Sequence, residues 1–278
     1  MILSTIIDEQ VVRKPHQAAA STEKFDLIVV GLGTAGAIAA ITAAEQGLSV
    51  LAIDQMNVMG GTGTAGGVLS YYFGAKGGRF EQIDEQVAAY SKETYTPSDG
   101  VNGELKKYVL EQQAKRAGVD IRYEYSVTGV MMNGNLVCGI EYYGADGFHY
   151  AESRVVIDST GEAHECALAG CELRGGRQLD RKAQPYSNVQ LLLKGGRVRT
   201  FYTDSGYVDP RDARDISRAI IQSALLNTHL KHTYNAAERT LQIAPLLGVR
   251  EGRFIVSEED VTLLGYLENQ HTEQPIFH

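Results

Sequence analysis

A GxGxxG motif, GLGTAG, begins at Gly31 and is the clearest chemical signature in the sequence. In such a motif Gly31 makes a tight turn, Gly33 lets a pyrophosphate approach the backbone, and Gly36 lets a helix pack closely on a strand. Thr34 and Ala35 then offer free backbone N–H groups at the start of that helix, where an anion is favoured. The spacing predicts a dinucleotide-binding turn.

An acidic residue follows the motif at the distance expected for ribose recognition. Asp54 lies 18 residues after Gly36, at the end of the next predicted strand, and Gln55 follows it. A carboxylate accepts hydrogen bonds from ribose hydroxyls, and an acid in place of an arginine disfavours a 2′-phosphate. We therefore expect the site to bind a dinucleotide other than NADP.

The elements around the motif form a β-α-β unit: a β-branched strand at 25–30, an alanine-rich helix at 37–46 and a strand at 48–53. Further strands are predicted at 119–125 and 154–157, with a small antiparallel meander at 127–130, 136–142 and 147–151 and helices near 80–90, 103–117 and 212–226. The pattern predicts an α/β fold, a Rossmann-like domain with a parallel sheet and a small antiparallel meander.

Two more segments combine glycines with hydroxyl side chains. Gly60 and Gly61 are followed by Thr62 and Thr64, and the strand that ends near Ile157 runs into DSTGE, which contains Thr160, Gly161 and Glu162. Glycines permit close approach of the backbone to a ligand, and hydroxyl groups donate to it.

Four segments in this order resemble the FAD-dependent oxidoreductases of the glutathione-reductase-like flavoprotein class, and distantly the fumarate reductase flavoproteins. They are GLGTAGAIAAITAAEQGLSVLAID (31–54), MGGTGTAGGV (59–68), VVIDSTGEAHECALAG (155–170) and LLGVREGRFIVSEEDV (246–261).

The resemblance implies FAD as the cofactor. It places the double-glycine loop around the ribityl and pyrophosphate groups, Thr160 and Gly161 against the flavin, and the backbone of Val127 at the adenine. Glu162 stands where the family more often has Asp. Relatives that attach FAD covalently use a histidine in the loop after the double glycine, and this loop has none, so we expect non-covalent FAD.

The residues that carry the chemistry are left open by the sequence. Tyr71 and Tyr72 are candidates to border the flavin ring, although core or interface packing is the simpler interpretation. His164 is a candidate acid or base, against a structural role. A charged cluster at Arg250, Glu251 and Arg253 is a candidate grip for an anionic substrate, against an internal ion-pair network.

Composition narrows the class of partner. The 278 residues carry 26 basic and 34 acidic side chains, a formal net charge of -8, which disfavours binding to nucleic acids or anionic membranes. No apolar stretch approaches the roughly 20 residues of a membrane span. Cys138, Cys166 and Cys171 have no metal-ligand spacing, and we expect reduced thiols in a cytoplasmic protein without a bound metal.

The predicted organisation is an N-terminal extension (1–24), an FAD domain (25–164), an inserted α+β substrate or cap region (165–245) and a return to the FAD domain (246–278). Flavoproteins of this class close the site with a late glycine-rich segment, and nothing after Asp260 resembles it. We therefore expect a second polypeptide to supply that part, with an artificially shortened chain as the competing explanation.

The expected function is hydride transfer between FAD and a small organic molecule. A non-catalytic FAD-binding or nucleotide-binding subunit, and an NAD-binding protein with an unrelated second half, are the alternatives.

Overall fold

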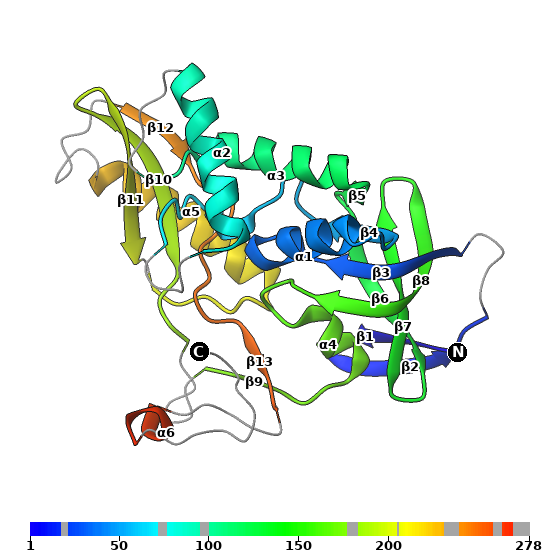
Figure 1. The fold of residues 1–278 in the computed structure, drawn as a ribbon. Helices are drawn as coiled ribbons and strands as arrows, with labels where there is room; N and C mark the ends of the chain where they lie inside the picture. Colours follow the sequence, from blue (N-terminus) through cyan, green and yellow to red (C-terminus); the bar gives the residue numbers. More distant parts are fainter. Residues whose placement is uncertain are drawn as a thin grey trace.

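The computed structural model describes residues 1–17, 22–71, 77–94, 100–176, 183–204, 206–230, 239–257 and 263–268. The largest sheet contains β1 (Ile2–Ile7), β2 (Gln10–Pro15), β3 (Glu23–Val30), β4 (Val50–Asp54), β5 (Asp120–Tyr123), β6 (Ser126–Asn133), β7 (Leu136–Gly144) and β8 (Gly147–Asp158). Their order across the sheet is β2-β1-β6-β7-β8-β3-β4-β5 (Figure 1).

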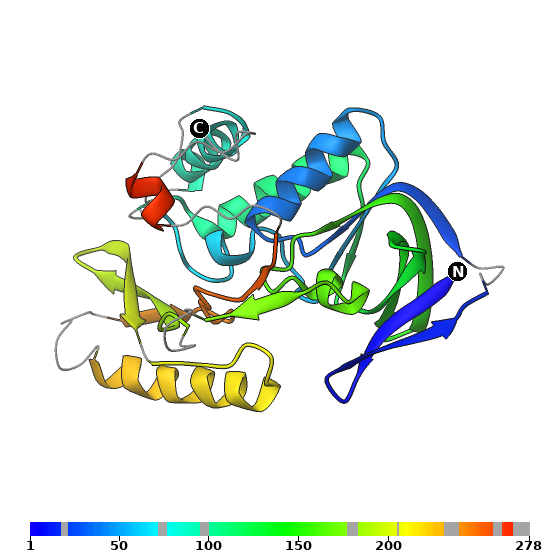
Figure 2. The same ribbon diagram turned by 90° about the horizontal axis from the view of Figure 1, so that it is seen from below.

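Four strands, β8, β3, β4 and β5, run parallel and carry the dinucleotide motif. Helices α1 (Thr34–Glu45), α2 (Arg79–Thr94) and α3 (Gly103–Ala117) gather on one side of them (Figures 1 and 2). Buried side chains of the strands, such as Val29 and Ala52, pack there against Ile41 and Val109 of the helices. The predicted Rossmann-like α/β class is confirmed.

The antiparallel meander covers the other face of the parallel strands. Ile28 and Leu51 pack there against Val130 and Ile140 of the meander in a second apolar core. Separate strands are predicted from the sequence at 147–151 and 154–157, but residues 147–158 form the single strand β8. This strand pairs antiparallel with β7 and parallel with β3, so it joins the two halves of the sheet.

The N-terminal residues extend this sheet. Strands β1 and β2 form a hairpin, and β1 also pairs with β6, within the residues predicted as an N-terminal extension. The hydroxyl of Ser4 is buried and donates to the carbonyl of Leu168 at 2.6 Å, so the hairpin is anchored to α4 (His164–Ala169).

Two smaller sheets complete the described part of the chain. One has the order β11-β10-β12, from β10 (Ser187–Lys194), β11 (Arg197–Asp204) and β12 (Arg239–Ile243), with α5 (Ala213–Leu230) packed against β10. The other pairs β9 (Leu173–Gly175) with β13 (Arg253–Ile255), and α6 (Leu263–Leu267) follows. The boundaries of the domains stay a prediction. Within the described residues no helix is long and apolar enough to cross a membrane.

Candidate cofactor site

Two glycines of the GLGTAG turn are required by the fold itself. Gly31 has φ +85°, and a Cβ on it would lie 2.7 Å from the carbonyl group of Ser159 at the end of β8. A Cβ on Gly36 would lie 1.9 Å from the carbonyl oxygen of Gly31. These two positions therefore pack the end of β3 against the start of α1 and the neighbouring strand.

Gly33 differs, because the fold does not require a glycine there. Its φ is an ordinary −66°, and among the described residues the nearest heavy atom to an added Cβ is the Cα of Gly61, at 4.0 Å. No side chain caps the N-terminus of α1 in the described part of the chain. An open space beside uncapped helix N–H groups fits a pyrophosphate, so the residues present fit a dinucleotide such as FAD.

The double-glycine loop is folded back onto this turn. Gly60 has φ +98°, and its N–H donates to the carbonyl of Leu32 at 2.8 Å. A Cβ on Gly61 would lie 2.8 Å from the Cα of Gly33. The hydroxyl of Thr34 donates to the carbonyl of Gly60 at 3.3 Å. The two glycine-rich segments predicted from sequence therefore form one continuous backbone surface.

The two threonines of that loop have different surroundings. Thr64 is buried and its hydroxyl donates to the carbonyl of Met59 at 2.6 Å, so it stabilises the loop. Thr62 is exposed. A direct contact of either hydroxyl with a cofactor stays a prediction.

Asp54 lies at the end of β4 and is tied to the same turn. Its Oδ2 accepts from the N–H of Leu32 at 2.5 Å and its Oδ1 from the N–H of Met56 at 2.7 Å. Burial raises the pKa of Asp54, and these two hydrogen bonds oppose the rise. Each oxygen retains a second lone pair for a ribose hydroxyl. Gln55, the next residue, is exposed.

The turn at the end of β8 is organised by Asp158. Its Oδ1 accepts from the hydroxyl of Thr160 at 2.7 Å and from the N–H of Thr160 at 3.1 Å, while its Oδ2 accepts from the N–H of Cys166 at 3.1 Å. Burial would raise the pKa of Asp158, but hydrogen bonds to its carboxylate outweigh burial and lower it. An ionised Asp158 therefore holds Thr160 and Gly161 in place.

Glu162, beside them, turns towards β13. A Cβ on Gly252 would lie 2.7 Å from both carboxylate oxygens of Glu162, and the Nε of Arg253 donates to the carbonyl of Glu162 at 2.7 Å. Burial raises the pKa of the Glu162 carboxyl. The extra methylene relative to Asp is thus accommodated against a glycine that lies far away in sequence.

Glu165, one turn further, is a buried carboxyl on α4. Neither of its carboxylate oxygens has a partner with normal hydrogen-bond geometry in the described structure, although Asp158 is near enough to act on it. Burial, followed by the charge of Asp158, raises the pKa of Glu165 to about 9. Glu165 is therefore protonated at neutral pH.

The two tyrosines and the charged cluster predicted from the sequence do not form one site. Tyr71 is half-exposed and its hydroxyl accepts from the Nζ of Lys106 at 2.7 Å, while Tyr72 lies outside the described residues. The cluster predicted near the C-terminal strand is divided. Arg250 donates to the Ser187 hydroxyl at 3.1 Å and Glu251 accepts from the Gln184 N–H at 2.8 Å, whereas Arg253 binds Glu162.

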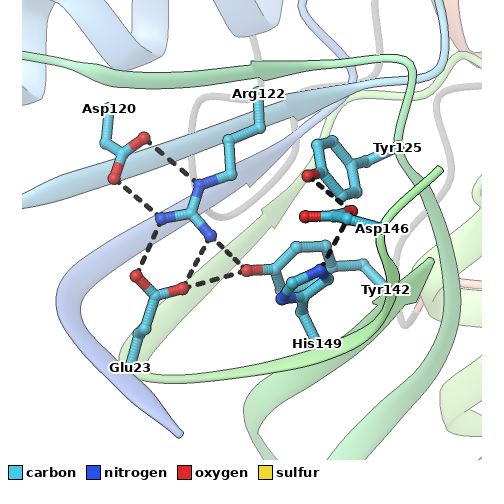
Figure 3. A network of polar contacts seen from close by, with 7 residues as sticks. All are labelled: Glu23, Asp120, Arg122, Tyr125, Tyr142, Asp146 and His149. Carbon is cyan, nitrogen blue, oxygen red and sulfur yellow. Dashed lines mark hydrogen bonds and ion pairs between the residues drawn. The ribbon is translucent and has the colours of Figure 1, made fainter. Parts of the chain in front are cut away.

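A polar network links the meander to the parallel strands (Figure 3). Arg122 on β5 donates to both carboxylate oxygens of Glu23 on β3, at 2.6 and 2.8 Å, and also contacts Asp120 and the hydroxyl of Tyr142 on β7. The hydrogen bonds from Arg122 lower the pKa of Glu23. The ring of His149 stacks on that of Tyr142, with centroids 5.3 Å apart.

Asp158 and Gly252 were not predicted from the sequence, and neither was the contact between His164 and Val127. Asp158 directly precedes the recognised Ser-Thr-Gly, so a polar residue at a strand end was an available signal. Gly252 and His164 act on residues 90 and 37 positions away, on Glu162 and Val127, and nothing local in the sequence indicates such contacts. Among the described residues there is no cluster of His, Cys, Asp and Glu that could hold a metal ion.

These features define a dinucleotide-binding α/β fold of the flavoprotein type. A profile of the family described as FAD dependent oxidoreductase matches residues 26–224. The chain belongs to this family, and its cofactor is FAD.

Among curated proteins, it is 30% identical over 155 residues to digeranylgeranylglycerophospholipid reductase 1 of Methanococcoides burtonii. It is 30% identical over 157 residues to digeranylgeranylglycerophospholipid reductase 2 of Methanopyrus kandleri. Each match covers 50% of this chain and 38% of the relative. Among solved structures, a geranylgeranyl bacteriochlorophyll reductase-like protein from Thermoplasma acidophilum superposes with a TM-score of 0.48 at 15% identity, covering 85% of this chain and 67% of the other.

Proposed function

We propose that the protein transfers hydride between FAD and a small organic molecule with an apolar body. Membership of an oxidoreductase family establishes the enzyme class. The observation that supports FAD in this place is Gly33, where the fold leaves open space beside the N-terminus of α1. Bound FAD would supply the two-electron chemistry, and the protein would bind, orient and exclude water.

The character of the substrate is suggested by β10. A Cβ on Gly67, in the glycine-rich loop, would lie 2.9 Å from Cγ1 of Val189, so this face of β10 is directed towards the cofactor loop. Because side chains alternate along a strand, Leu191 and Leu193 belong to the same apolar face. The curated relatives are named as reductases of a digeranylgeranylglycerophospholipid, which is in keeping with an apolar substrate.

We also propose that a second polypeptide covers the site. Phe254, Ile255 and Val256 directly follow Arg253 and are 42%, 47% and 39% exposed, an unusual run of apolar side chains beside a cofactor turn. The match to the curated relative covers 38% of its length. A partner chain would bury this run and exclude water from the reacting centre.

Non-covalent attachment of FAD is part of the proposal. Denaturation by heat or acid should release intact FAD into the supernatant. Flavin retained on the unfolded polypeptide contradicts non-covalent binding, and release of NAD alone contradicts the choice of cofactor. Because all three cysteines are free thiols, we propose a reducing compartment, the cytoplasm.

Reoxidation kinetics provide the test of function. The natural material is reduced with dithionite, and candidate unsaturated apolar and polar acceptors are compared for their rate of flavin reoxidation. We expect fast reoxidation by an apolar acceptor. A flavin that no acceptor and no donor turns over supports the alternative, a non-catalytic FAD-binding subunit.

Size-exclusion chromatography followed by denaturing gel analysis tests the partner. A companion polypeptide should elute with this chain and with FAD. A single 30.3 kDa species that carries stoichiometric FAD and turns over would exclude the second chain.

A further inference from the structure

The topology orients the cofactor across the ends of three strands. β3 lies between β4 and β8 in the sheet, and ligands of open α/β sheets bind at the carboxyl ends of the strands where the direction of winding reverses. Asp54, at the end of β4, marks the ribose side of the adenosine. The turn from Asp158 to Glu162, at the end of β8, would therefore face the flavin half of a bound FAD.

The start of β6 lies next to Asp54, the residue proposed to bind the ribose of the adenosine. The N–H of Tyr125 donates to the carbonyl of Asp54 at 3.3 Å, so the chain leading into Val127 runs directly beside the ribose acid. Val127 itself is buried. Its backbone would therefore lie close to the adenine of a bound FAD, if Asp54 binds the ribose.

His164 connects these two sides. Its Nε2 lies 3.0 Å from the carbonyl oxygen of Val127, and its backbone N–H donates to the hydroxyl of Thr160 at 3.1 Å. That hydroxyl in turn donates to Asp158. Because a carbonyl only accepts, Nε2 is the donor in the hydrogen bond to Val127.

We infer that His164 is a positioning residue, which fixes the adenosine side of the FAD site to the turn at the end of β8. The side chain of His164 donates to the carbonyl of Val127, and its backbone N–H donates to the hydroxyl of Thr160. Replacing the side chain removes only the first link, because the backbone N–H remains. The consequence is a loss of affinity for ligands that contain adenosine.

The inference rests on the proposed placement of FAD. FMN has the flavin and one phosphate but lacks adenosine, whereas ADP has the adenosine and lacks the flavin. A purely structural histidine would, on its loss, disturb the whole turn and weaken all three ligands together. The pattern across the ligands therefore distinguishes a positioning role from general support of the fold.

The experiment measures dissociation constants for FAD, FMN and ADP on the full chain, with its partner where one co-purifies. His164→Leu removes the donor, and His164→Gln restores an N–H donor near Val127. His16→Leu is the control, because His16 is a histidine packed on an aromatic ring, that of Tyr150 (centroids 4.8 Å apart), in another part of the sheet. Circular dichroism and thermal melting accompany each variant.

We expect His164→Leu to weaken the binding of FAD and of ADP by about tenfold each, the loss of one partly buried hydrogen bond. The affinity for FMN should change by less than about twofold. His164→Gln should recover most of the loss, and His16→Leu should bind as the wild type does. Equal weakening of FMN and FAD, or unchanged FAD in His164→Leu, overturns the inference. If His164→Leu does not fold, His164→Gln decides, since near-normal FAD affinity is then required. If the wild-type protein binds neither FAD nor ADP, the proposed function fails first.

Discussion

Replacing Gly33 by alanine should weaken FAD binding by several kcal/mol and leave the fold intact. The backbone at Gly33 has φ −66°, which alanine adopts without strain, and an added Cβ would come no nearer than 4.0 Å to a described protein atom. Alanine at this helix N-cap should cost the protein about 1 kcal/mol or less. The space that the Cβ enters is the one the pyrophosphate needs.

The magnitude follows from the hydrogen bonds at stake. A phosphate displaced from the N-terminus of α1 loses charge-assisted bonds from N–H groups such as those of Thr34 and Ala35, each contributing about 1.5–3 kcal/mol. Losing two of them costs about 3–6 kcal/mol, which is a factor of about 10² to 10⁴ in the dissociation constant.

The assay combines thermal melting of the FAD-free protein with a titration followed by flavin fluorescence. Gly36→Ala is the contrasting variant: its Cβ would lie 1.9 Å from a carbonyl oxygen, so it should lower stability by about 1–3 kcal/mol or more. Gly175→Ala is the control, because no described heavy atom lies within 4 Å of the added Cβ. Normal FAD affinity in Gly33→Ala would refute the placement of the cofactor.

Three further outcomes are expected. Asp54→Ala should weaken FAD by about 1–3 kcal/mol, measured by the same titration, and an unchanged constant would remove Asp54 from the site. Glu165 has a folded-state pKa raised to about 9, so its contribution to stability is present below the unfolded value and is lost as the pH rises towards 9. At pH 8 the free energy of unfolding of Glu165→Gln should therefore exceed that of the wild type by at least about 1 kcal/mol. This difference in stability should disappear near pH 4. Equal stability of the two proteins at pH 8 would contradict the buried neutral carboxyl. For Glu23 the hydrogen bond from Arg122 lowers the pKa, so its contribution to stability is present above the unfolded value and is lost as the pH falls through the lowered folded value. In Glu23→Gln the loss of stability at acidic pH should be smaller by about 1 kcal/mol, because the ion pair with Arg122 is partly exposed. If thermal melting at a series of acidic pH values shows the same loss in both proteins, the ion pair does not contribute to stability.

The parts of the fold predicted from sequence are those fixed by local signals. The helix at 103–117 has an Asn102 cap whose side chain accepts from two backbone N–H groups, and it ends at Gly118 with φ +86°. The GLGTAG turn likewise carries its own conformational requirements in its glycines. Both were therefore visible without any knowledge of distant contacts.

The N-terminal hairpin was missed for an equally local reason. Its turn is made by Asp8 and Glu9, with φ of 50° and 63°. Tight hairpin turns are usually recognised in a sequence by Asn-Gly or Asp-Gly, and this turn has neither. For β8, two strands were predicted, with a gap at Glu152 and Ser153. The strand continues because its partner changes there from β7 to β3, which only the complete sheet determines.

Contacts between residues far apart in the sequence connect β13 to the cofactor site. The backbone of Gly252 packs on the Glu162 carboxylate and Arg253 binds the Glu162 carbonyl, so β13 is attached directly to the cofactor turn. The next residues, Phe254 to Val256, are the exposed apolar run that we assign to a partner. If the proposed partner covers them, it would restrain β13 and with it Glu162, and by linkage bound FAD would strengthen the association to the same degree. Cofactor retention and assembly are therefore expected to be one coupled equilibrium, with β13 as the element that both share.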